Sequence, residues 1–343
     1  VVVPPLGAKE IFEGQARFCQ LQYLYFYFGK SRKWSYFEAK GMLSGLYREA
    51  FQAYLEATEF DAPDELDSPV VGLFLLVCDI AINPVEGFAQ DFEELQNLVA
   101  THDIGTRFLR LCWAIRDHPN LYSTAIVDYS ADEYRKVSSS LCNDAGLKSP
   151  QDLFHCIDSW LTDIPSLAKL LEEDREFKFE EANLPVRLFF ARFLRLQVDK
   201  KAHPEFFCWT GVWMGGSARP ISLDRHLALF EEHSALFMDK EDGDVYPRTL
   251  ENRDPDAVDE TFNNFYAYVA TYQLSRQWII EAGKFDCEFS WLTTKYTQDE
   301  IVAWASGLFK SAYGVDLDDF ILIDEPSDKV VQEARQRTVL ERN

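Results

Sequence analysis

The residues from Lys9 to Phe28 place apolar side chains around most of a helix. At about 100° per residue, the apolar positions fall on two faces: Ile11, Phe18, Leu21, Tyr25 and Phe28 on one, and Phe12, Cys19, Tyr23 and Phe26 on the other. The polar positions form one narrow stripe: Lys9, Glu10, Glu13, Arg17 and Gln20. A helix that is apolar on nearly every side belongs inside a domain. We therefore expect it to be the most buried long helix of the chain.

Two further helices follow from the pattern. Val70 to Ile82 is apolar almost throughout and stops at Asn83-Pro84. Its length of about 13 residues favours a buried helix over a strand, with Ser68 as the N-cap. Trp34 to Glu59 is predicted as one helix, in which Gly41 and Gly45 would allow a close helix crossing.

Helical patterns of this kind recur along all 343 residues and predict an all-α, multi-helix protein. This length exceeds the usual single-core limit, so we expect two packed helical lobes with at most short peripheral strands, such as one at Asp316 to Asp324. The N-terminal lobe would span residues 1–171 around helix 9–28, and the C-terminal lobe residues 183–343. The charged stretch within 172–182 is the predicted boundary.

The charge balance indicates which classes of partner the protein is expected to bind. The chain carries 34 basic and 57 acidic residues, a formal charge of −23, which argues against a nucleic-acid-binding protein. The seven cysteines are spaced singly, without a CxxC pair or a disulfide framework, and so favour a reducing, cytoplasmic location. The sequence shows no signal peptide, and its longest apolar run is too short to cross a bilayer. We expect no contact with a membrane.

Four polar residues are the candidates for a catalytic site: Glu13, Arg17, Asp79 and His102. Glu13 and Arg17 are four residues apart, so they can pair along one helix face. Asp79 has apolar neighbours and needs a hydrogen-bond donor or a cation if it is buried. A hydrogen bond near Asn83 would satisfy it. The alternative is an ion pair with Arg17 that joins the first and third helices and lines a pocket.

The sequence gives metal chemistry little support. Glu13-Gly14-Gln15-Ala16 and Glu86-Gly87-Phe88-Ala89 resemble the helix that supplies the glutamate ligand in gluzincin metallopeptidases. The resemblance implies an HExxH zinc helix, which does not occur here and would have to precede Val1. His226 and His233 lie roughly 10 Å apart along one predicted helix, too far for a shared zinc ion. We therefore expect no metal site and no cofactor.

The segment from Ala202 to Pro220 carries an aromatic loop, which we define as Phe206, Phe207, Trp209 and Trp213. Tryptophan is enriched at binding hot spots, so these side chains are candidates for a binding surface. They could equally be a lid over an apolar pocket, or side chains that fill the helical core. The leading hypothesis is a non-catalytic interaction or adaptor subunit that presents a helical surface and this loop to a protein partner. The alternative is an enzyme, a hydrolase or a metal-dependent one, with its polar site in a helical cavity.

Overall fold

The computed structural model describes residues 6–87, 90, 98–180, 183–215, 223–239, 245–250, 252–280, 287, 289–316 and 319. Apart from one two-stranded antiparallel sheet and an isolated bridge, the regular structure of these residues is helical, so the all-α prediction is confirmed. The chain forms two compact units. Unit 1 comprises Val1–Leu171 and Arg192–Leu236, and unit 2 comprises Glu172–Ala191 and Phe237–Asn343.

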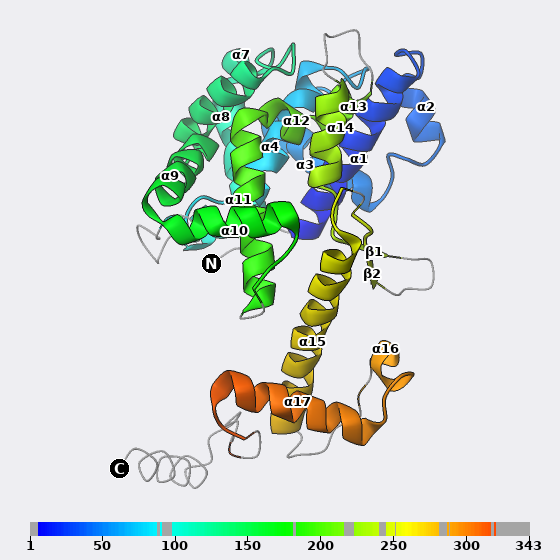
Figure 1. Ribbon diagram of the computed structural model, residues 1–343. Helices are drawn as coiled ribbons and strands as arrows, with labels where there is room; N and C mark the ends of the chain where they lie inside the picture. The colour runs from blue at the N-terminus through cyan, green and yellow to red at the C-terminus, as the bar shows by residue number, and fades with distance from the viewer. Residues whose placement is uncertain are drawn as a thin grey trace, which may run out of the picture. The chain divides into compact units, whose positions relative to one another are not determined.

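Unit 1 is a layered group of helices around α4 (Figure 1). Helix α4 contacts α1, α6, α8 and α12. The helices of this unit are α1 (Ala8–Tyr27), α2 (Trp34–Ala39), α3 (Leu46–Thr58), α4 (Pro69–Ile82), α5 (Leu98–His102), α6 (Ile104–Asp117), α7 (Pro119–Tyr122), α8 (Ala131–Ala145), α9 (Pro150–Asp163), α12 (Pro204–Cys208), α13 (Thr210–Met214) and α14 (Leu223–Glu232). Helices α10 (Pro165–Glu176) and α11 (Leu184–Ala202) contribute residues to both units.

Helix α4, and not α1, is the most buried long helix of unit 1. Every residue from 71 to 81 is buried. Phe18 and Leu21 of α1 are also fully buried, but Phe12 is 48% exposed and Tyr27 is 66% exposed. The prediction that α1 is the most buried helix is therefore wrong, because other helices cover only part of its apolar circumference.

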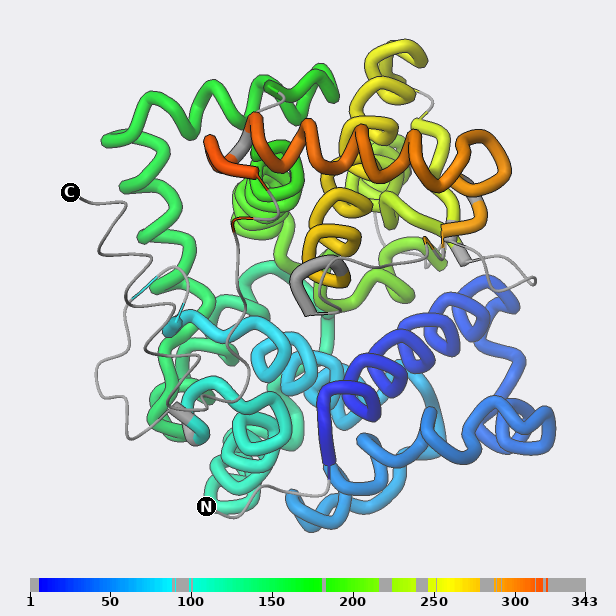
Figure 2. The backbone as a smooth tube through the Cα atoms, turned by 90° about the horizontal axis from the view of Figure 1, so that it is seen from below, coloured from blue at the N-terminus to red at the C-terminus, as the bar shows by residue number. Residues whose placement is uncertain are grey.

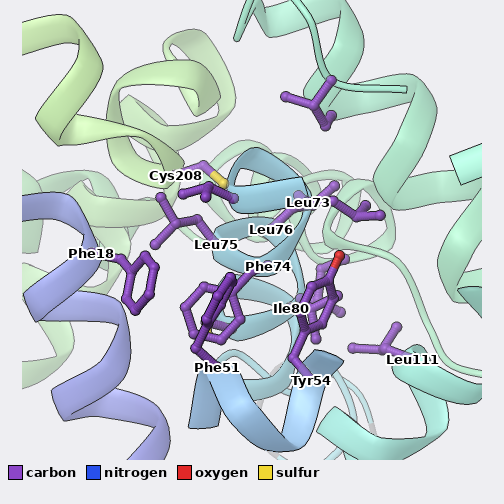
Figure 3. Packing of buried hydrophobic residues seen from close by; sticks show 14 of the residues in the cluster. Phe18, Phe51, Tyr54, Leu73, Phe74, Leu75, Leu76, Ile80, Leu111 and Cys208 are labelled. Carbon is purple, nitrogen blue, oxygen red and sulfur yellow. The ribbon is translucent and has the colours of Figure 1, made fainter. Parts of the chain in front are cut away.

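Aromatic rings from three helices form the centre of unit 1 (Figure 3). The ring of Phe51 lies 4.5 Å from that of Phe18 and 5.0 Å from that of Phe74. Burial of each phenylalanine contributes about 1.5–3 kcal/mol. Gly14 allows α1 to approach α3 closely, since a Cβ atom at this position would lie 3.1 Å from the Cβ of Ala50. The glycine of the first Glu-Gly-x-Ala segment therefore has a packing role.

The predicted helix from Trp34 to Glu59 is two helices, α2 and α3. Gly41 and Gly45, which the sequence analysis placed inside one helix, have φ angles of +70° and +55°. These left-handed conformations are readily adopted by glycine and are incompatible with a continuous right-handed helix. The two glycines form the turn and do not mediate a helix crossing.

The C-terminal end of α4 is capped by a buried arginine from α6. Arg107 is 2% exposed and donates hydrogen bonds to the carbonyl oxygens of Ile80 (2.6 Å) and Ala81 (3.1 Å). These are among the carbonyl groups that a helix leaves without partners at its end. Burial lowers the pKa of Arg107 to about 10, so the guanidinium stays charged at neutral pH.

The predicted boundary at 172–182 does not separate two sequential lobes. Residues 192–236, which the sequence analysis assigned to the C-terminal lobe, belong to unit 1. The indole nitrogen of Trp209 donates to the carbonyl oxygen of Gly72 at 2.9 Å. A Cβ atom at Gly211 would lie 2.0 Å from the carbonyl oxygen of Cys19, so α13 lies directly on the backbone of α1. This close packing joins the segment to helices far away in the sequence.

Within the part of unit 2 that the structure describes, there are the small sheet and three further helices. Strands β1 (Phe237–Asp239) and β2 (Val245–Pro247) pair antiparallel. Helix α17 crosses α15 (Figure 2), and the predicted strand at Asp316 to Asp324 lies largely outside the described residues. The helices that belong wholly to this unit are α15 (Pro255–Ile280), α16 (Ser290–Thr293) and α17 (Gln298–Tyr313).

Candidate functional site

Asp79 lies on α4 in the interior of unit 1 and is 4% exposed. Its Oδ1 atom accepts a hydrogen bond from Lys200 Nζ at 2.6 Å, and its Oδ2 atom accepts one from Tyr134 Oη at 2.8 Å. The amide of Asn83 is a weaker third donor, 3.3 Å from Oδ1. Both oxygens of the buried carboxylate therefore have partners, as a charge in this position requires.

Lys200 reaches Asp79 from the last turn of α11, and Tyr134 reaches it from α8. The side chain of Lys200 is 5% exposed, so this ion pair is shielded from solvent on both sides. Burial, together with the negative charge of Asp79, raises the pKa of Tyr134 well above its usual value. The phenol therefore remains protonated and keeps donating. The ion pair and the hydrogen bond thus connect α4, α8 and α11 through one buried polar network.

The predicted ion pair between Asp79 and Arg17 is wrong. Arg17 donates from its Nη1 atom to Gln20 at 2.8 Å, and its guanidinium carbon lies 3.9 Å from the centre of the Tyr47 ring. Arg17 thus packs against α3, while Lys200 occupies the place beside Asp79. The predicted pocket between α1 and α4 depended mainly on this ion pair, so its main support is removed.

The other two catalytic candidates lie on separate elements. Glu13 is half-buried on α1, and His102 is the last residue of α5. Neither Glu13 nor His102 is among the described side chains that bind the carboxylate of Asp79, which are Lys200, Tyr134 and Asn83. Sequence reasoning missed Lys200 and Tyr134. Both partners lie far from Asp79 along the chain, so the local pattern around Asp79 does not identify them.

The aromatic loop is divided between the core and a half-buried rim. Trp209 is 0% and Phe206 is 3% exposed, so neither is available to a partner in this structure. The rings of Tyr129 and Tyr134 pack edge-on against Trp209. Phe207 and Trp213 are half-buried. Phe206 and Trp209 therefore fill the helical core, as the alternative interpretation of this loop expected. We no longer propose these two residues as part of a binding surface.

His226 of α14 and His233, the residue that follows this helix, contact different groups. His233 Nε2 lies 2.8 Å from Asp199 Oδ2, whereas the ring of His226 stacks on that of Phe206. Burial lowers the pKa of His226, with the nearby Glu205 carboxylate partly opposing the shift. Within the described residues, no group of three or more His, Cys, Asp or Glu side chains is placed to hold a metal ion. The two imidazoles serve to pack α14 against α11 and α12.

Exposed aromatic side chains gather at the C-terminal end of α1. Tyr23 is 38%, Tyr27 66% and Phe28 41% exposed. The rings of Tyr23 and Tyr27 stack 6.0 Å apart, and Phe28 packs edge-on against Tyr27 at 5.5 Å. The guanidinium of Arg32 lies over both Phe28 (5.7 Å) and Tyr36 (4.7 Å). We call these five residues the α1 aromatic surface. Two of its rings, Tyr23 and Phe28, are among the apolar positions from which a buried helix was predicted.

Comparison with known proteins adds no identification. No protein-family model matches the chain, and no curated protein or solved structure is significantly similar to it. Among the described helices, none is both long and apolar enough to cross a membrane.

Proposed function

We propose that the protein is a non-catalytic interaction subunit that binds a protein partner through the α1 aromatic surface. The proposal rests on one observation: the exposed rings of Tyr23, Tyr27 and Phe28 contact one another in sequence and form a contiguous apolar surface. Isolated exposed apolar residues are common, but contiguous ones mark interaction sites. We propose this surface, in place of the aromatic loop, as the binding site. A cytoplasmic location remains part of the proposal.

The chemistry of the surface supports a protein as the ligand. Tyrosine and arginine are, with tryptophan, the residue types enriched among the hot spots of protein interfaces. A tyrosine ring buries a large area while its hydroxyl keeps a hydrogen-bonding group at the rim. Arg32 adds a cation that is held in place by two rings. A partner segment with an apolar or aromatic anchor beside a carboxylate would match these groups.

Charge distribution favours Arg32 as the point where the carboxylate binds. Its neighbours Lys30 and Lys33 are already neutralised, Lys30 by Asp67 at 2.5 Å and Lys33 by Glu65. Arg32, by contrast, forms no ion pair with a described residue. A second copy of this chain is a poorer partner, because two bodies of charge −23 repel each other.

The test is an affinity isolation from cells of the source organism, quantified by mass spectrometry. Wild-type protein is compared with Tyr27→Ser, and Tyr272→Ser is the matched control because Tyr272 is 64% exposed. We expect at least one protein to be lost with Tyr27→Ser and kept with Tyr272→Ser. If the two variants retain the same proteins as the wild type, the proposed surface is not the binding site.

A further inference from the structure

Unit 2 contains a pocket of about 670 Å³ between α15, α17 and the turn that precedes α17. This volume lies within the range of about 300–1,000 Å³ that is typical of small-molecule sites. Its apolar wall includes Leu292, Ile301 and Trp304. Leu292 (6% exposed) and Ile301 (1%) belong to a small hydrophobic cluster, which gives the pocket a packed base.

The N-terminal cap of α17 fixes one polar side of the pocket. Glu300 Oε2 accepts hydrogen bonds from the backbone nitrogen and the hydroxyl group of Thr297, both at 2.8 Å. The pKa of Glu300 is lowered, chiefly by the backbone hydrogen bond from Thr297, so the carboxylate is ionised at neutral pH. One of its oxygens is thus already engaged within the protein.

Lys295 lines the same pocket, beside Tyr296. It forms no ion pair with any described residue. Lys310 of α17, by contrast, is paired with Asp316 at 2.8 Å. Glu300 lines the same pocket, but none of the described carboxylates forms an ion pair with Lys295, so its ammonium group can pair with an anionic group of a ligand.

We propose that this pocket binds a small aromatic carboxylate or sulfonate. The anionic group would pair with Lys295, and the aromatic ring would lie against Trp304 and Tyr296, over Leu292 and Ile301. An aromatic ring uses the apolar wall, as ligand sites commonly do, while one or two polar groups set the orientation. The site is independent of the α1 aromatic surface.

The test uses the 343-residue chain and two fluorescent probes of nearly the same ring structure. 8-Anilinonaphthalene-1-sulfonate carries the anion, and N-phenyl-1-naphthylamine lacks it. Lys295→Met removes the cation and is expected to weaken binding of the sulfonate roughly two- to fivefold, because an ion pair of an exposed lysine is partly screened by solvent. The same change should leave the neutral probe unaffected. Trp304→Ala should weaken binding of both probes, and Lys310→Met neither.

Circular dichroism of each variant shows whether the fold is kept, and Lys295 is exposed, so its replacement should be tolerated. Unchanged sulfonate affinity in Lys295→Met overturns the proposed anion site. Equal weakening of both probes by Lys295→Met does so as well, because the lysine would then act only through packing. Absence of binding, or binding that no pocket variant alters, overturns the pocket as a ligand site.

Discussion

Removal of the carboxylate of Asp79 is expected to be among the most destabilising single changes in unit 1. Asp79→Ala leaves Lys200 as a buried, unpaired cation, since the lysine side chain is only 5% exposed. Breaking a buried ion pair in this way costs about 3–5 kcal/mol. Tyr134 loses its acceptor at the same time. Because the three groups share one site, we expect the total to stay near the upper end of that range and not to be a simple sum.

The assay is urea unfolding at neutral pH of Asp79→Ala, Lys200→Met and the double variant. The double variant has no unpaired charge, so it should be more stable than the sum of the two single effects predicts. The coupling free energy should be at least about 2 kcal/mol. Arg17→Met serves as the control, because Arg17 contacts Gln20 and Tyr47 instead of Asp79. Additivity of Asp79→Ala and Lys200→Met within about 0.5 kcal/mol would refute the ion pair.

Two further predictions concern helix packing and pH. Gly211→Ala should unfold or strongly destabilise unit 1, because its Cβ atom would lie 2.0 Å from the carbonyl oxygen of Cys19. Gly307→Ala, in the open interior of α17, should instead stabilise the protein by about 0.5–1 kcal/mol in thermal unfolding. Similar effects of the two changes would contradict the close contact. His226 has a lowered folded-state pKa, so the unfolded chain binds its proton more readily. The contribution of His226 to the free energy of unfolding is present above about pH 6.5 and is lost as the pH falls through the folded-state pKa of this residue. His226→Phe should therefore lose less stability than the wild type between about pH 7.5 and 5.5; equal losses would show that His226 is not responsible.

The sequence pattern predicted the helical fold and the burial of α4 because both depend on local information. Ser68, Pro69 and the stop at Asn83-Pro84 define the ends of α4, and its apolar composition requires an interior position. The need of Asp79 for a partner follows from the same local pattern. Its actual partner does not, because Lys200 lies 121 residues further along the chain and reaches Asp79 only through tertiary packing.

The glycines and aromatic residues show a second limit of sequence reasoning. Gly41 and Gly45 form a turn, whereas Gly211 and Gly215 allow α13 to lie on α1. The local sequence is compatible with either role. Likewise, Trp209 is core and Tyr27 is exposed, although both stand in aromatic-rich stretches. Which ring is covered depends on the neighbouring helices, and a one-dimensional pattern does not contain that information.

Site-specific photo-crosslinking from the α1 aromatic surface tests the proposed interaction most directly. A photoreactive phenylalanine analogue replaces Tyr27 in one protein and Tyr272 in another, two positions of nearly equal exposure (66% and 64%). After irradiation in cells of the source organism, position 27 should yield one defined crosslinked protein, and Arg32→Gln should reduce its yield. Position 272 should not yield that protein. The same products from both positions, or a crosslink only between copies of this chain, would contradict the account.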